Sequence, residues 1–180
     1  MGDYDVVLLV EQALSAQDAA QVRGLHEDIE EPVTYHVLIP VEDSATQIES
    51  GMGALAGGEV LATPTMFLDP DDIDEIRREV LDAARSAVRE SVAALEAVGG
   101  KAVGDMVSVD PIQALAKKVS DVDAREAIIL TRPHVVSEFF HLDWTSRARR
   151  KLGVPVLHLL EHENFDEQAE HYGGEGVTGL

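Results

Sequence analysis

A short cluster of polar residues follows one apolar run of the chain and forms the first candidate binding site. The run is Ala127 to Leu130, and Thr131, Arg132 and His134 come shortly after it. A histidine needs little perturbation to exchange protons near neutral pH, so His134 could serve acid-base chemistry. No nucleophile or oriented carboxylate is paired with His134 in the sequence, so the cluster favours binding over acid-base catalysis.

The residues after this cluster predict a helix and a second strand. From Asp143 the apolar residues fall on one helical stripe, and Gly153 ends the helix. Val154 to Leu160 is again a continuous apolar run with β-branched residues. The stretch therefore predicts a strand, helix, strand unit with parallel strands and a right-handed crossover. In such a unit the loop after the first strand faces the amino end of the helix, where open α/β sheets hold anionic ligands.

The rest of the chain alternates between apolar runs and helical patterns, which predicts a doubly wound α/β domain. The other strands are expected at Tyr4 to Val10, Val33 to Val41 and Lys101 to Val109. Two of the other helices are expected at Ala16 to Ile29 and Ile112 to Val119, and a third, the longest, starts in Asp69-Pro70-Asp71-Asp72 and is closed by Gly99-Gly100. This order predicts an open sheet of five parallel strands in a single domain over residues 1–162. Residues 43–67 lack the pattern and are expected to be a long loop, either a lid or a mobile segment. Residues 163–180 are expected to be an acidic, glycine-containing tail that does not pack.

The charge of the chain excludes several classes of partner. The 180 residues include 34 acidic and 14 basic side chains, which gives a formal net charge of -20. Binding to phosphates depends on Lys and Arg, so we expect neither a nucleic-acid partner nor a membrane partner. There is no cysteine, which excludes disulfides and thiolate chemistry. The first apolar run has no basic residues before it, and no run approaches the roughly 18 residues of a membrane helix, so we expect a cytoplasmic protein.

The order of these motifs resembles the universal stress protein family. The resemblance is carried by Leu9-Val10-Glu11, Val109-Asp110-Pro111, Leu130-Thr131-Arg132-Pro133, Leu142-Asp143 and Pro155-Val156. It implies a fold similar to the adenine-nucleotide alpha hydrolases, with strand order 3-2-1-4-5. It also implies a ligand site across the ends of the first and fourth strands, and a dimer through the last strand.

A candidate cleft follows from this resemblance and from the polar cluster. Its residues are Glu11, Asp110, Thr131, Arg132, His134 and Asp143. The family's phosphate loop is rich in glycine, which lets backbone N–H groups approach an anion. Here Pro133 has no N–H to donate, and the Asp143 carboxylate would occupy helix amides that a phosphate needs. We therefore expect no cofactor and no ATP binding in the family's manner.

Two functional interpretations remain open. The first is a non-catalytic protein that acts in the stress response by binding a small ligand or a protein partner. The rival is a nucleotide-binding member or an enzyme of the same superfamily, which would use Glu11, Arg132 and His134 around the cleft. The absence of the glycine loop favours the first interpretation.

Two other clusters are candidates for a metal or an anion site. His158 and His162, with His36 on a strand that could lie nearby, do not share a fixed face, so we expect surface or core histidines and no metal. A basic cluster is expected to stabilise the carboxyl end of a helix rather than to bind an anion. It consists of Arg147, Arg149, Arg150 and Lys151.

The last apolar run predicts a symmetric homodimer. Alternate residues between Val154 and Leu160 are apolar on both faces. The free edge of this strand would otherwise stay unpaired, and edge pairing about a two-fold axis is a common way to cover it.

Overall fold

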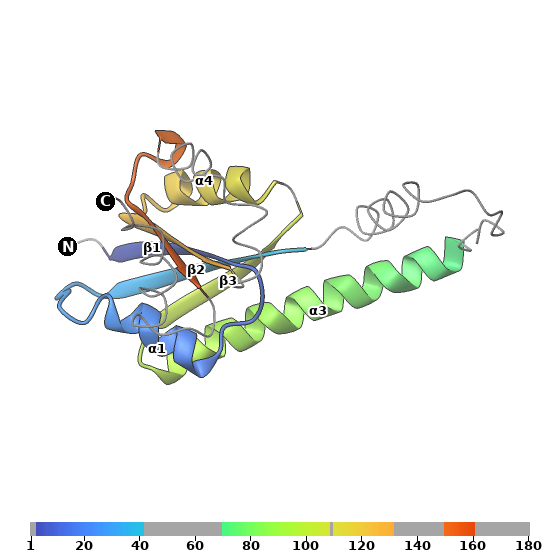
Figure 1. The fold of residues 1–180 in the computed structure, drawn as a ribbon, viewed down its shortest axis with the longest axis horizontal. Coiled ribbons are helices and arrows are strands. Elements are labelled where there is room, and N and C mark those ends of the chain that lie inside the picture. Colours follow the sequence, from blue (N-terminus) through green and yellow to red (C-terminus); the bar gives the residue numbers. More distant parts are fainter. Residues whose placement is uncertain (1–2, 42–69, 109, 132–149, 161–180) are drawn as a thin grey trace, which may run out of the picture.

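The computed structural model describes residues 3–41, 70–108, 110–131 and 150–160. Its centre is a five-stranded parallel sheet with the order β3-β2-β1-β4-β5 (Figure 1). The strands are β1 (Tyr4–Val10), β2 (Val33–Pro40), β3 (Lys101–Val107), β4 (Glu126–Thr131) and β5 (Val156–Leu160). The helices are α1 (Ala16–Gly24), α3 (Pro70–Ala97) and α4 (Pro111–Asp121). The predicted fold class and strand order are confirmed. The predicted loop 43–67 and the predicted tail 163–180 lie outside the described residues.

The first strand is the centre of the sheet because it is apolar on both faces. β1 pairs with β2 on one side and with β4 on the other. Every residue from Val6 to Val10 is buried. A strand without an alternating polar face is stable only where helices cover both sides, as in parallel α/β sheets.

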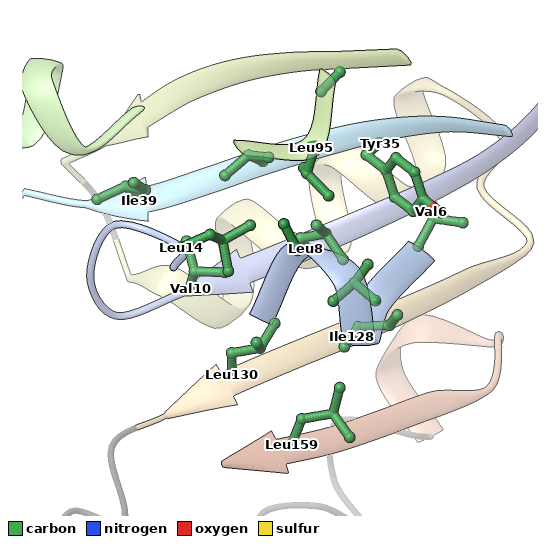
Figure 2. Close-up of a cluster of buried hydrophobic side chains, with 14 residues drawn as sticks. Val6, Leu8, Val10, Leu14, Tyr35, Ile39, Leu95, Ile128, Leu130 and Leu159 are labelled. Atoms are coloured by element: carbon green, nitrogen blue, oxygen red, sulfur yellow. The ribbon is translucent and has the colours of Figure 1, made fainter. Parts of the chain in front are cut away.

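The helices form a layer on each face of the sheet, so the chain has two hydrophobic cores. One core contains Leu8 from β1 and Leu95 from α3 (Figure 2). Ala19 from α1 belongs to the same core. The other contains Leu9 from β1 and Leu115 from α4. In Figure 1, α1 and α3 lie on the side of the sheet opposite α4.

The first helix is shorter than predicted. It begins with a capping box, in which Ser15 accepts from the N–H of Asp18 and the Asp18 side chain accepts from the N–H of Ser15. It ends at Gly24 instead of Ile29. The next residues turn so that His26 is buried, with its Nδ1 2.9 Å from the Val22 carbonyl oxygen, while Leu25 is 37% exposed. Tertiary contacts of His26 therefore end the helix before its apolar pattern does.

Other boundaries differ from the prediction by a few residues. β2 and β3 end at Pro40 and Val107, while α4 continues to Asp121. β5 begins at Val156 because Pro155 has no N–H for the ladder, although its carbonyl oxygen accepts from Ala127 at 3.0 Å. The helix before β5 is described only over residues 150–152. Gly153 follows it at a φ of 68°, as expected for a glycine that ends a helix.

The longest helix contacts the sheet with only part of its length. α3 packs on β3 and β2, and its amino-terminal half extends beyond the sheet (Figure 1). The close approach to β3 is possible because Gly104 has no Cβ. A Cβ at this position would lie 2.6 Å from Cγ1 of Val88 and 3.1 Å from Cγ2 of Val92. Buried Ser91 also joins α3 to the β1–α1 connection, because its hydroxyl accepts from the Leu14 N–H at 3.0 Å.

Candidate functional site

The strand order singles out one edge of the sheet for ligand binding. β1 leads to β2 on one side, whereas β4 lies on the other side of β1 and leads to β5. In open α/β sheets a ligand binds outside the carboxyl ends of the strands where such a change of direction occurs. We call the end of the sheet formed by the carboxyl ends of β1 and β4 the carboxyl edge, as distinct from the two edge strands, β3 and β5. It holds Glu11, whose backbone N–H donates to the Leu130 carbonyl oxygen at 3.3 Å, and Thr131, the last residue of β4.

The hydroxyl of Thr131 is held by a histidine of the neighbouring strand. Thr131 Oγ1 lies 2.8 Å from Nε2 of His158. In the register, Thr131 pairs with Leu160 and His158 pairs with Ile129, so the two side chains are diagonal neighbours on one face. Thr131 is buried and His158 is partly buried. Burial lowers the pKa of His158 below its usual value, so the imidazole is neutral at pH 7.

Asp110 lies at the amino end of α4 and acts as a helix cap. Its side chain accepts from the backbone N–H groups of Ile112 at 3.0 Å and Gln113 at 2.9 Å. These amides are among the groups with which a helix amino terminus would bind an anion. The predicted cleft residue Asp110 therefore provides hydrogen-bond acceptors for the first N–H groups of its own helix.

The structure thus brings together part of the predicted cleft. Glu11 and Thr131 lie at the carboxyl edge, and Asp110 lies where β3 gives way to α4. Arg132, His134 and Asp143 lie outside the described residues. The described polar residues at the carboxyl edge are an acidic residue, Glu11, and a hydroxyl, Thr131, which is held by the neutral imidazole of His158. These groups suit a ligand with hydrogen-bond donors better than a polyanion.

The described part of the basic cluster lies at the opposite end of the strands from the carboxyl edge. Arg150 and Lys151 precede β5, so they are near the amino ends of the parallel strands, and both are exposed. They are therefore remote from Glu11 and Thr131. This placement agrees with the interpretation of the cluster as the end of a helix. Arg147 and Arg149 lie outside the described residues.

The histidines weighed as metal ligands are far apart. His36 is on β2 and His158 is on β5, with β1 and β4 between these strands. Three strand spacings correspond to about 14 Å, which is too far for one metal ion. His36 instead pairs through Nε2 with Asp5 Oδ1 at 2.7 Å. Within the described ranges, no group of three or more His, Asp and Glu side chains could hold a metal ion. His162 lies outside those ranges.

A buried polar cluster near the amino ends of the strands was not predicted from the sequence. Nε2 of His26, which is 2% exposed, contacts the carboxylate of Glu126 on β4. Nδ1 of the same ring lies 3.0 Å from the hydroxyl of Tyr35 on β2, and Tyr4 of β1 packs against the ring at 6.0 Å between centroids. Burial raises the pKa of Tyr35, so its phenol stays protonated. The one signal in the sequence was an ionisable residue, Glu126, at the first position of a buried strand.

Solved structures with a similar fold include universal stress protein UspA from Lactobacillus plantarum. It is 13% identical, the match covers 88% of this chain and 99% of that chain, and the TM-score is 0.52. The hypothetical protein PH0823 is 18% identical over 89% of this chain and 98% of that chain, with a TM-score of 0.51. No protein-family model and no curated protein matches the chain.

The chain has the universal stress protein fold. At these identities the likeness establishes the fold, and the site must be judged from its own residues. Among the described helices of this universal stress protein fold, none combines the length and the apolar character needed to cross a membrane.

Proposed function

We propose that this chain is a cytoplasmic, universal-stress-protein-like binding protein that performs no catalysis. It binds a small ligand or a protein partner at the carboxyl edge and does not bind ATP in the family's manner. One observation carries the proposal. Glu11 brings an acidic residue to this edge, and the first amides of α4 are not free for an anion, because the Asp110 carboxylate accepts from Ile112 and Gln113.

The electrostatics of the edge oppose a triphosphate. A chain with a net charge of -20 repels anions at long range, and Glu11 adds an acidic residue next to the end of β4. The residues after Thr131 include Pro133, which cannot donate an N–H. Each lost charge-assisted bond removes roughly 1.5 to 3 kcal/mol, so two lost bonds weaken binding by roughly two to four decades.

Titration calorimetry with Mg-ATP tests this part of the proposal. We expect no binding in the low micromolar range, because the phosphate oxygens would meet acceptors and too few donors. The Thr131→Ala and Arg132→Ala variants serve as controls and should give the same trace as the parent protein. Low micromolar binding that disappears in either variant would contradict the proposal and return both residues to nucleotide contacts.

Native mass spectrometry of the protein purified from its own host tests the binding role directly. We expect a copurifying small molecule or protein that carries no triphosphate. Recovery of bound ATP at one equivalent per chain would contradict the proposal and favour the nucleotide-binding alternative.

We further propose a symmetric homodimer through β5. Within the part of the chain that the structure describes, β5 pairs only with β4, and Leu157 on it is 40% exposed. We expect light scattering at micromolar concentration to give a dimeric mass, and Leu157→Lys to give a monomer because it buries a charge in the interface. Val103→Lys is the matched control, since Val103 is 47% exposed on the opposite edge strand β3. A monomeric parent protein, or dissociation by the control alone, would rule out β5 as the interface.

A further inference from the structure

The contact between Thr131 and His158 is a hydrogen bond, so it constrains the direction of the Thr131 O–H group. A threonine hydroxyl has one proton to donate and two lone pairs to accept with, and its rotation decides which of them faces a ligand. Thr131 is 9% exposed, and among the described residues His158 Nε2 is the hydrogen-bond partner of its side chain, at 2.8 Å. The state of His158 therefore determines how Thr131 presents itself at the carboxyl edge.

Leaving a buried hydrogen-bond donor without an acceptor costs more free energy than leaving one lone pair of an acceptor without a donor. An unsatisfied buried donor costs free energy comparable to a lost hydrogen bond, whereas a second lone pair is often left without a partner. A neutral imidazole can offer Nε2 as that acceptor if its proton is on Nδ1. Thr131 then donates its proton to Nε2 and turns only lone pairs toward the edge.

We propose that His158 is a positioning residue of the candidate site, which fixes the Thr131 hydroxyl as an acceptor when neutral and reverses it when protonated. This inference rests on the proposed function, because it assigns a ligand preference to the same edge. With neutral His158 the hydroxyl accepts hydrogen bonds and selects ligands that donate them, such as amines, amides or sugar hydroxyls. With protonated His158 the Nε2–H donates to Oγ1, and the threonine proton turns outward to meet an anion.

The surroundings of His158 suit this role. His158 is on β5, and the register places it beside Ile129 and diagonally from Thr131 on β4. Burial is the cause that lowers the pKa of His158. Because the pKa is lowered from the usual 6.5, the ring gains its proton only in acidic solution. The acceptor state is therefore the state at pH 7.

Imidazole nitrogen NMR tests the first step without any ligand. We expect Nε2 of His158 to be unprotonated at pH 7.5 and its resonance to move when Thr131 is changed to Val, which removes the hydroxyl and keeps the shape. Assignment comes from His158→Gln, whose spectrum lacks the signal. A proton on Nε2 at pH 7.5, or a resonance that does not respond to Thr131→Val, would overturn the proposal.

Sulfate binding at two pH values tests the second step, because sulfate keeps its charge between them. We expect sulfate to bind the parent protein at least about tenfold more tightly at pH 5.5 than at pH 7.5, from one added bond to a charged group. His158→Gln is the matched control, since it can pair with Thr131 but does not titrate, and it subtracts the general effect of a less acidic chain. An equal pH dependence in both proteins would overturn the proposal. The proposed function is judged separately by the copurifying ligand.

Discussion

Replacing His26 with alanine is expected to lower the free energy of unfolding by about 2 to 4 kcal/mol. The imidazole is 2% exposed, and its two nitrogens contact Glu126, the Val22 carbonyl oxygen and the Tyr35 hydroxyl. Alanine would leave the Glu126 carboxylate and the Tyr35 hydroxyl without this partner and would open a cavity between α1 and the sheet. Thermal denaturation should show a loss of about 4 to 16 °C for a chain of this size.

A partly buried histidine provides the control for this measurement. His36 is 13% exposed, and among the described residues its side chain pairs with the carboxylate of Asp5 at 2.7 Å. His36→Ala should therefore cost about 1 kcal/mol. If the two variants denature at the same temperature, the cluster around His26 does not stabilise the fold in the way that we argue.

Replacing Gly104 with alanine is expected to lower the free energy of unfolding by about 1 to 3 kcal/mol. The new Cβ would lie 2.6 Å from Cγ1 of Val88, closer than carbon atoms can approach. Val88 is β-branched and held on α3, so it cannot rotate away at little cost. Either α3 moves away from β3 or the strand shifts, and both weaken the core. Chemical denaturation gives the change directly.

Two further variants decide whether this close contact is the cause. Val88→Ala removes the clashing methyl groups, so the Gly104→Ala and Val88→Ala double variant should be more stable than the sum of the single effects predicts. Gly24→Ala is the control for a glycine in open space, because nothing lies within 4 Å of a Cβ there, and it should be neutral or slightly stabilising. Strict additivity in the double variant would contradict the proposed contact.

The sheet could be predicted from the sequence because most of the strands are continuous apolar runs. β1 was predicted at its observed bounds, since a run such as Tyr4–Val10 between polar residues has few other solutions. The end of α1 could not be predicted, because the partner of His26 is Glu126, 100 positions later in the chain. Local periodicity carries no information on such a contact.

Only part of the candidate site could be predicted, because contacts between distant parts of the chain are not visible in local sequence patterns. Thr131 could be placed at the end of β4 from the sequence, because strand ends are local features. Its partner His158 could not, since their contact depends on the register between β4 and β5. Asp110 was predicted at the start of a helix, but its two hydrogen bonds to the α4 amides depend on side-chain geometry that the sequence does not specify.

The position of β1 in the sheet has a consequence for the order in which the protein assembles during translation. β1 emerges first and can pair early with β2, but Val6 must wait for Glu126, about 120 positions later, before its other side is covered. At typical rates of synthesis this delay is about 6 to 24 s. Throughout it, the nascent chain has an unpaired, strongly apolar strand edge, which is the kind of surface that chaperones bind and that aggregates recruit. The contact between His26 and Glu126 closes only when β4 docks, so it forms among the last steps of folding on the ribosome.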